Sequence, residues 1–257
     1  MISVTRRAGP AHALRNQYLD PLPEPQGLYL ENLVSAGVSW SIRRDDREIG
    51  YAVTDGDETL VELHLIAGET GRLTAAFDAL LQVCNLRRVL AKTFDSDLLF
   101  VALSRPAQVS TIGFLYRVIV DPRFEADAQI TVRAATQEDI PSLHVLSADF
   151  FDSEAEIEAY LRADGLLLYA FRGGEPFGAG VVMRVVEGRD DFDIGVVVHP
   201  ERRRRGHGAY IIGHLKSWCL EKGWRPICGC AFDNIGSQGA LRRAGFAARH
   251  RLVEFRM

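Results

Sequence analysis

The chain has 257 residues, of which 47% are hydrophobic and 25% are charged, a composition that is ordinary for a soluble globular protein. Its formal net charge of −4 gives no overall reason to expect nucleic acid as a partner. No apolar run is long enough to span a membrane, and the N-terminus lacks the hydrophobic stretch of a signal peptide. The length allows one large domain or two domains of about a hundred residues or more.

The cysteine content predicts free thiols rather than disulfides or a metal site. Four cysteines do not make a disulfide framework in a chain of this length. Cys228 and Cys230 stand one residue apart on a predicted strand, which is not the spacing of metal ligands. We therefore expect buried thiols, no metal, no membrane association and a location in the reducing cytoplasm.

The first half of the chain reads as alternating strands and helices. Residues up to about 25 contain three nearby prolines and are expected to be irregular. Apolar residues from Leu73 to Cys84 recur at helical spacing and predict a helix that faces a core. A further helix is expected at 28–36, and strands are expected at 38–43, 49–54, 59–66 and 89–94.

A second series of elements begins after the turn-rich segment 121–127. The sequence predicts a strand at 130–133, a helix that starts near 153–156, and strands at 166–172, 178–186 and 192–198. Pro200 ends the last of these strands, because proline cannot donate to a ladder. Apolar residues from Ile211 to Cys219 then indicate a helix that stops at Gly223.

The turn between that strand and that helix has the features of an anion site. Four arginines, Arg202 to Arg205, precede two glycines, Gly206 and Gly208. The first N–H groups of a helix are unpaired, and glycines let a ligand approach the main chain closely. In a mildly acidic protein this local basic cluster favours a small anion, above all phosphate, over a polyanion. A solvated arginine cluster before an ordinary helix is the alternative interpretation.

Two motifs in this half resemble those of the GNAT superfamily of N-acetyltransferases. Arg203-x-x-Gly206-x-Gly208 is similar to the loop whose amides wrap the pyrophosphate of acetyl-CoA, and Asn234-x-x-Ser237 leads to a closing Gly245-Phe246. The resemblance covers roughly residues 130 to 257. It implies that acetyl-CoA is the co-substrate and that the coenzyme contacts are made by Val196, Val198, Arg203, Arg204, Arg205, Gly206, His207, Gly208, Ala209 and Asn234.

The two halves share one order of predicted elements, which indicates an internal duplication. This order resembles a tandem GNAT arrangement, with a degenerate domain at 1–125 and an acetyl-CoA-binding domain at 126–257. The first half has Ala67 to Arg72 where the anion loop should be, with an acid and the wrong glycine spacing. The expected fold class is α/β (α+β), each domain being a mixed, mainly antiparallel twisted sheet flanked by helices. A chance likeness of two generic α/β halves is the alternative.

Acetyl transfer to an amine needs a group that removes a proton and an outlet for the thiolate. Asp193 takes the place where the resemblance puts a strand glutamate, so it is the candidate base, although Asp190 and Asp191 beside it fit a solvated acidic turn. Leu241 stands where many family members carry a tyrosine acid. Ser237, a water or a tyrosine elsewhere are the candidates for that role, and the alternative is that no group takes it.

Other functions are weighed against this one. A nucleotide-binding P-loop is excluded because Ala209 and Tyr210 follow Gly208, where Lys and Ser or Thr would be required. A non-catalytic acyl-CoA sensor or interaction module remains, because the motif supports binding more firmly than turnover. The expected partner is a small-molecule or peptide amine, its identity is not encoded in any motif, and a homodimer is left open.

Overall fold

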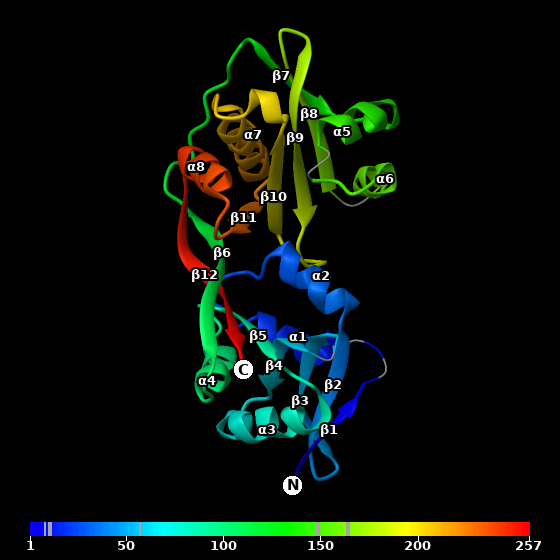
Figure 1. Cartoon of the computed structure of the whole chain (residues 1–257), viewed down its shortest axis with the longest axis vertical. Coiled ribbons are helices and arrows are strands. Elements are labelled where there is room, and N and C mark those ends of the chain that lie inside the picture. The colour runs from blue at the N-terminus through cyan, green and yellow to red at the C-terminus, as the bar shows by residue number, and fades with distance from the viewer. Residues whose placement is uncertain (8, 10–11, 57, 148–149, 163–164) are drawn as a thin grey trace. The chain divides into compact units, whose positions relative to one another are not determined.

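The computed structural model describes residues 1–7, 9, 12–56, 58–147, 150–162 and 165–257. Contacts divide the chain into two compact units (Figure 1). Unit 1 consists of Met1–Phe114 together with His250–Met257, and unit 2 consists of Leu115–Arg249. Each unit is described by itself below.

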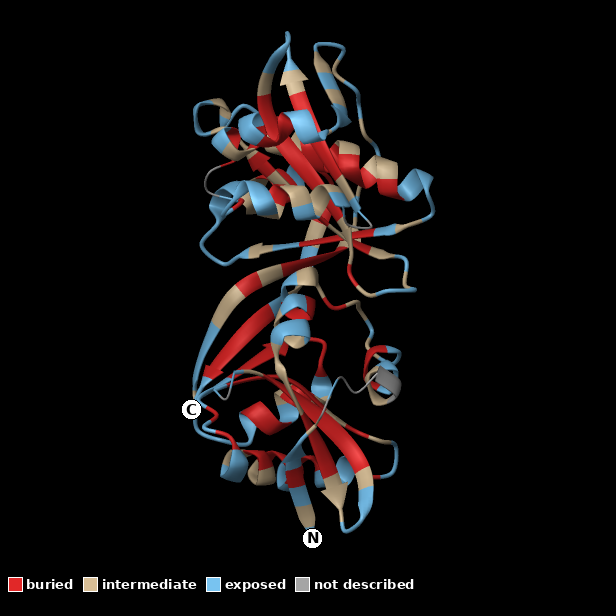
Figure 2. Ribbon diagram, turned by 90° about the vertical axis from the view of Figure 1, so that its right-hand side faces the viewer, coloured by how far each residue is buried: buried red, intermediate tan, exposed pale blue. Residues whose placement is uncertain are grey.

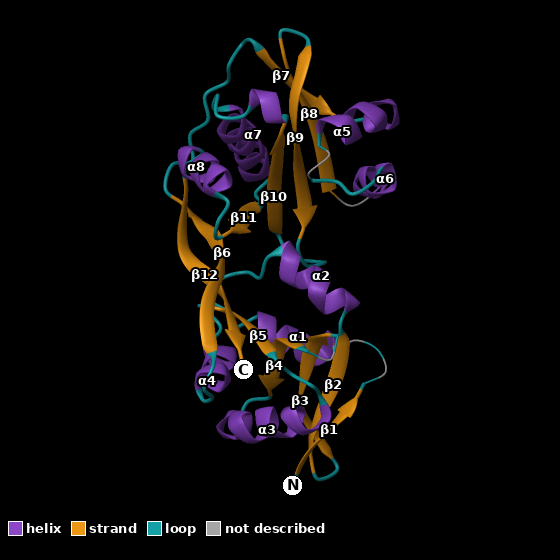
Figure 3. Cartoon of the chain, in the orientation of Figure 1, coloured by secondary structure: helices purple, strands orange, loops and turns teal. Residues whose placement is uncertain are grey.

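Unit 1 is a sheet with helices, as Figure 3 shows by element type. Its elements in chain order are β1 (Ile2–Arg6), α1 (His12–Leu19), α2 (Leu28–Ala36), β2 (Val38–Arg44), β3 (Arg47–Asp55), β4 (Thr59–Leu65), the 3-10 turn η1 (Thr70–Arg72), α3 (Leu73–Val83), β5 (Arg88–Lys92), α4 (Ser96–Leu103) and the first part of β6 (Gln108–Ile119).

The strands of unit 1 are joined mainly in antiparallel fashion. In the order β1-β2-β3-β4-β5-β12, only β4 and β5 run parallel. β12 (Phe246–Arg256) enters this sheet through its second part, where Val253 pairs with Ala91. The parallel pairing of β4 with β5 is short, with register pairs at Thr59 and Leu60.

One face of this sheet carries the apolar core. Helix α3 packs Leu73, Phe77 and Leu80 onto strand residues such as Ile42 and Ile49, all of them buried. Figure 2 shows this burial on the strands and on the helix faces turned toward them. The predicted apolar stripe is confirmed, because a helix that presents such a stripe must cover it with a second layer.

Unit 2 repeats the order of elements seen in unit 1. After the last residues of β6 it contains β7 (Ile130–Ala134), η2 (Gln137–Asp139), α5 (Ile140–Leu146), α6 (Glu154–Arg162), β8 (Gly165–Arg172), β9 (Glu175–Arg184), β10 (Asp191–Val198), η3 (Pro200–Arg202), α7 (His207–Glu221), β11 (Arg225–Ala231), α8 (Ile235–Arg243) and the first residues of β12.

The sheet of unit 2 has the order β6-β11-β10-β9-β8-β7. β7, β8, β9 and β10 are antiparallel neighbours, and β10 pairs in parallel with β11. Helix α7 lies close on β9, because a Cβ at Gly180 would be 2.7 Å from Ile211 and 2.9 Å from Leu215. On the other face α5 and α6 bury Leu143 and Ile157 against the strands.

These findings confirm the predicted fold class of two tandem domains, each with a mixed, mainly antiparallel sheet. One prediction was wrong: the segment before residue 25 is not irregular throughout, because it contains β1 and α1. The prolines that suggested irregularity lie after α1 and end it. Cys84, Cys219 and Cys228 are buried and all four cysteines are free. Among the described residues, no helix has the length and apolar character needed to cross a membrane.

Candidate functional site

The candidate site of unit 2 is built on the turn between β10 and α7. η3 follows β10, and the backbone then passes through two left-handed residues, Arg204 with φ +61° and Gly206 with φ +84°. Gly206 is the N-cap residue of α7. Left-handed residues at such spacing curve the main chain so that successive N–H groups point outward into one concavity, which is a geometry that binds anions.

The backbone amides of this turn are open to a ligand. From Arg204 to Ala209, none of the six N–H groups donates to a protein acceptor within the described part of the chain. The first paired N–H group of α7 is that of Tyr210, which donates to the carbonyl of Gly206. An ordinary helix start leaves four N–H groups unpaired, so this turn offers more donors than a helix N-terminus alone.

Some side chains of the turn are exposed to solvent, and others hold the turn in place. Arg204 and Arg205 are exposed and carry charge beside the open amides. Arg203 donates from Nε to the carbonyl of Val198 at 3.0 Å and so ties the loop to the end of β10. This bond leaves its guanidinium partly committed to the protein rather than to a ligand.

His207 supports the turn from below. It is 5% exposed, its ring packs against Phe177 with ring centroids 4.3 Å apart, and its Nδ1 lies 3.0 Å from the carbonyl oxygen of Arg202. Burial lowers the pKa of His207, partly offset by that carbonyl. The imidazole therefore faces the protein, and only the N–H of His207 is placed to contact a ligand in the turn.

β10 and β11 part next to the turn. Their register pairs end at Asp193 and Ile227, so Val196 and Val198 lie beyond the pairing, where β10 is held by β9 alone. Both valines are half-buried. A strand edge that leaves its parallel neighbour presents backbone groups to whatever enters the gap, which is the role expected of these two residues.

Asp193 lies half-buried at the last register pair before the strands part. Burial raises the pKa of Tyr160, on α6, and the negative charges of Glu156 and Asp193 raise it further. Burial also raises the pKa of Cys228, again with a contribution from Asp193. The carboxylate therefore lies near Tyr160 and Cys228.

The second motif places Asn234 and Ser237 at the start of α8. Asn234 is the N-cap residue, and its Oδ1 accepts a hydrogen bond from the N–H of Ser237 at 2.9 Å. The hydroxyl of Ser237 makes no hydrogen bond with any described residue and is half-buried. Leu241, where a tyrosine acid is common in the family, is 4% exposed and packs inward.

A tyrosine that no sequence motif indicated lies on a neighbouring strand, next to the end of β11. Tyr116, on β6 beside β11, donates its phenol hydrogen to the sulfur of Cys230 near the end of β11. Burial is the main cause that raises the pKa of Tyr116 to about 12. No sequence motif links Tyr116 to this region, because neighbouring strands in the sheet are far apart in the chain.

The matching turn of unit 1 differs in charge and in its amides. Glu69 is buried there, and its carboxylate accepts from Arg44 at 2.8 Å and from Arg72 at 2.8 Å. The N–H of Arg72 already donates to the carbonyl of Glu69, and that of Leu73 to Thr70. A buried carboxylate and engaged amides make this turn a poor place for a phosphate.

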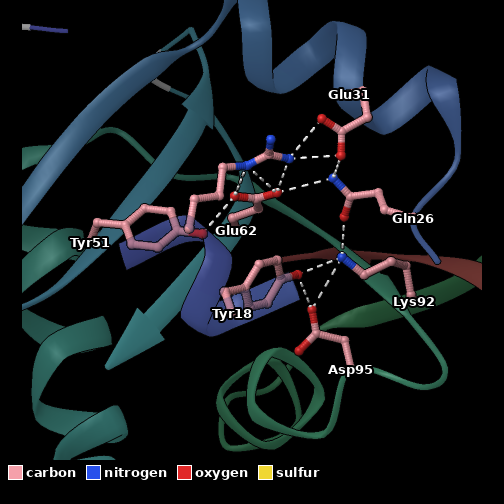
Figure 4. Close-up of polar contacts among 8 residues, drawn as sticks. Tyr18, Gln26, Glu31, Tyr51, Glu62, Lys92 and Asp95 are labelled. Atoms are coloured by element: carbon pink, nitrogen blue, oxygen red, sulfur yellow. Dashed lines mark hydrogen bonds and ion pairs between the residues drawn. The ribbon is translucent and has the colours of Figure 1, made fainter. Parts of the chain in front are cut away.

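In unit 1, side chains fill the space where the parallel strands β4 and β5 separate. After Leu60 and Val89 the strands β4 and β5 part, and the amide of Gln26 bridges them. Its Nε2 donates to Glu62 on β4 at 3.0 Å, and its Oε1 accepts from Lys92 on β5 at 2.5 Å (Figure 4). All three side chains are at most 2% exposed, so buried polar side chains fill the space where the parallel strands of unit 1 separate.

No group of three or more His, Cys, Asp or Glu side chains is placed to hold a metal ion among the residues that the structure describes. The donors at the unit 2 turn are backbone amides and guanidinium groups, which suit an anion. They fit the pyrophosphate of a coenzyme by charge and by number of N–H groups.

Comparisons with known proteins agree with the two-unit architecture. A model described as an acetyltransferase (GNAT) domain matches residues 10–118, and one described as the acetyltransferase (GNAT) family matches residues 133–246. A search of the curated proteins found no match.

Solved structures show the same fold. An acetyltransferase from the GNAT family of Colwellia psychrerythraea has a TM-score of 0.89 at 16% identity, with 99% of each chain covered. A tandem GNAT protein from the clavulanic acid biosynthesis pathway has a TM-score of 0.65 at 16% identity, with 99% of this chain and 98% of that chain covered. A GCN5-related N-acetyltransferase from Sphaerobacter thermophilus has a TM-score of 0.60 at 14% identity, with 85% of this chain and 80% of that chain covered.

At these identities the structural likeness shows the fold alone, whereas the two family models match on sequence. Each model matches one of the two repeats of the same element order. The chain belongs to the GNAT acetyltransferase family and carries two of its domains in tandem.

Proposed function

We propose that unit 2 is an N-acetyltransferase that takes an acetyl group from acetyl-CoA and passes it to a primary amine of a small molecule or peptide. The observation that carries this proposal is the run of open amides from Arg204 to Ala209. Together with the dipole of the fifteen-residue helix α7, these donors favour a pyrophosphate. Arg204 and Arg205 add two exposed positive charges at the same turn.

The chemistry asks two things of the protein. An alkylamine with a pKa near 10.4 is neutral in only about one molecule in a thousand at pH 7, so a group that accepts its proton assists the reaction. The neutral nitrogen then attacks the thioester carbonyl carbon and the C–S bond breaks. The nitrogen then loses a second proton while the departing thiolate gains one, and the proton that the ammonium form gave up first passes to the solvent, so the proton count balances.

Asp193 and Ser237 are the residues that we assign to these proton transfers. Asp193 is half-buried at the point where β10 and β11 part, so an amine that enters from the side of Tyr160 would meet its carboxylate. Ser237 has a hydroxyl without a hydrogen bond among the described residues, and its backbone is fixed by the Asn234 cap. Val196 and Val198 would contact the coenzyme through their backbone groups.

We further propose that unit 1 binds no coenzyme, which makes it the degenerate member of the tandem. Two observations favour this: the carboxylate of Glu69 at the turn, and the Gln26 bridge between β4 and β5. The free cysteines fit a reducing compartment, and we propose the cytoplasm as the location.

Calorimetric titration with acetyl-CoA tests the binding part of this proposal. We expect one acetyl-CoA per chain, and Gly206→Val should weaken its binding at least about tenfold. Two equivalents per chain would contradict the assignment of unit 1. No binding at all would contradict the assignment of unit 2.

Release of the free thiol of CoA tests turnover. The acceptor panel should contain polyamines, aminoglycosides, amino-acid derivatives and peptides with free amines, each at saturating acetyl-CoA. Turnover with any of them above the hydrolysis background supports an enzyme. Tight binding without turnover on the whole panel favours the alternative, a non-catalytic acyl-CoA sensor or interaction module.

A further inference from the structure

Unit 1 contains a cavity that the proposed coenzyme chemistry does not use. It has a volume of about 440 Å³, which lies within the range of small-molecule sites. Arg6, Arg7 and Arg15 contribute to its wall, and Val34, Val38 and Val53 give it an apolar part. None of the described residues that line it carries a carboxylate. The wall is therefore cationic on one side and apolar on the other.

Arg15 is the central polar group of this wall. Its Nε donates to Glu62 at 3.1 Å, and its Nη2 donates to Glu62 at 2.9 Å and to Glu31 at 2.7 Å. Its third nitrogen, Nη1, donates to no described residue. The side chain of Arg15 is 16% exposed and lines the cavity, so an acceptor that enters the cavity can reach the N–H groups of this nitrogen.

The guanidinium is held by a buried polar network (Figure 4). Glu62 accepts from the phenol of Tyr51 at 2.9 Å in addition to Arg15 and Gln26. Burial alone would raise the pKa of Glu62, but the hydrogen bond and charge of Arg15, with the charge of Lys92, lower it overall. Glu62 is thus ionised and fixes the orientation of Arg15, which is the support that a binding group needs.

The network continues away from the cavity to a second fixed cation. Lys92 is fully buried, and it donates to the phenol oxygen of Tyr18 at 2.5 Å and lies 3.3 Å from Asp95. Tyr18 in turn donates to Asp95 at 2.5 Å. Each carboxylate of the network is therefore matched by several donors, whereas Nη1 of Arg15, a residue that lines the cavity, has no acceptor among the described residues.

The charges around the cavity favour a carboxylate as the ligand. Arg7 is paired with Glu48 at 2.6 Å, and Arg6 is exposed at the end of β1. Glu48, which pairs with Arg7, and Glu31 and Glu62, which pair with Arg15, do not line the cavity. A ligand in the cavity is therefore nearer to the positive groups than to these acids. Because Coulomb energy falls with distance, the attraction to the arginines is the stronger of the two. Guanidinium groups recognise planar carboxylates through directed N–H donors.

We propose that the cavity of unit 1 binds a small organic acid, with its carboxylate on Nη1 of Arg15 and beside Arg6, and its apolar part on the three valines. The site lies entirely within unit 1 and uses none of the residues assigned to acetyl transfer. The degenerate domain would thus have exchanged coenzyme binding for the binding of a carboxylic acid.

Backbone-amide NMR of the full chain tests the proposal directly, without an activity assay. The probes are butyrate, benzoate and 3-phenylpropionate, each beside its primary amide, and inorganic phosphate. We expect at least one acid to shift the amides of Gly37 and Ser39, which line the cavity, in a saturable way. It should bind about tenfold more tightly than its amide, the factor that corresponds to one charge-assisted hydrogen bond.

Three variants locate the site. Arg15→Lys keeps a charge for Glu31 and Glu62 but removes Nη1, and should weaken the acid about tenfold. Ser35→Trp fills the cavity from the exposed side of α2 without touching the network and should abolish binding. Arg47→Gln removes an exposed arginine of unit 1 that does not line the cavity and should leave binding unchanged.

Four results would overturn the proposal. They are equal affinity for an acid and its amide, phosphate binding as tight as that of the best acid, binding that survives Ser35→Trp, and an absence of saturable shifts with every acid. If Arg15→Lys does not fold, the Ser35→Trp variant alone decides between a site in the cavity and one elsewhere. Because the readout comes from unit 1, a failed acetyl-transfer assay has no bearing on it.

Discussion

Gly206 and Gly188 share a left-handed backbone, with φ values of +84° and +76°, and a Cβ at either position would meet nothing within 4 Å. They differ only in place: Gly206 opens α7, whereas Gly188 lies between β9 and β10. Substitution by valine therefore imposes similar backbone strain at both, about 1–2 kcal/mol, because β-branched residues avoid this region.

Gly206→Val should weaken acetyl-CoA binding at least about tenfold, since the strained turn no longer aims its amides at one point. Gly188→Val is the matched control and should lower thermal stability by a similar amount with coenzyme affinity unchanged. Calorimetry on both variants is the measurement. Equal losses of affinity would mean that strain, rather than the anion turn, explains the effect.

Asp193→Asn should lower kcat/KM at pH values below the pKa of the acceptor amine, because the variant cannot accept a proton. Coenzyme affinity should change little, since Asp193 belongs to β10 and is not one of the turn residues from Arg204 to Ala209. Asp190→Asn, at a neighbouring side chain that is 77% exposed, is the control and should keep the wild-type rate. A wild-type pH profile for Asp193→Asn would show that this aspartate takes no part in the proton transfer.

Ser237→Ala should reduce kcat with the KM for acetyl-CoA unchanged, if its hydroxyl returns the proton to the thiolate. The Asn234 cap uses the backbone N–H of Ser237, so it survives the substitution. Ser217→Ala on α7, whose hydroxyl bonds to Glu221 at 3.2 Å, is the control. A normal rate for Ser237→Ala together with a large loss for Tyr116→Phe would transfer the role to Tyr116.

Glu62→Gln should destabilise unit 1 by roughly 3 kcal/mol, because it leaves Arg15 without one partner of a buried ion pair. Glu58→Gln, whose side chain is 52% exposed and 3.9 Å from Arg87, should cost less than about 0.5 kcal/mol. Urea denaturation followed by Trp40 fluorescence measures this for unit 1, in a background with Trp218→Phe and Trp224→Phe. Equal costs for the two variants would contradict a structural role for the pair.

The same pair predicts how stability depends on pH. The pKa of Glu62 is lowered in the folded state from its ordinary value of 4.5, so the folded protein binds this proton less readily than the unfolded chain. Its contribution is fully present above about pH 4.5 and is lost as the pH falls through the folded pKa. The difference in stability between wild type and Glu62→Gln should therefore shrink below pH 4.5.

Local patterns in the sequence were sufficient to predict most elements and the turn between β10 and α7. Glycine spacing after a β-branched strand encodes the turn directly, because Gly206 adopts a left-handed conformation that few other residues tolerate. The stripe from Leu73 to Leu80 likewise encodes a helix face. Such features involve residues close in the chain, where periodicity and turn chemistry act.

Features that depend on distant residues could not be predicted in this way. The network of unit 1 joins Tyr18 on α1, Glu62 on β4 and Lys92 on β5, and no local pattern distinguishes these residues from surface polar ones. Both units carry an acid on the strand before the turn, but at different positions. Glu62 lies three positions before Leu65, the partner of Gly50, whereas Asp193 lies five before Val198, the partner of Gly178. The domain limits at residue 125 stay a prediction.

The pairing of β12 with β5 has a consequence for the order in which the protein can fold. Residues 250–257 belong to unit 1, where Val253 pairs with Ala91, so this sheet lacks a strand until all of unit 2 has been synthesised. Pairing across such a sequence separation slows folding, because loop closure precedes any contact. During translation, β5 therefore presents an unpaired edge to the ribosome exit and to chaperones, and unit 1 is the later of the two to be completed.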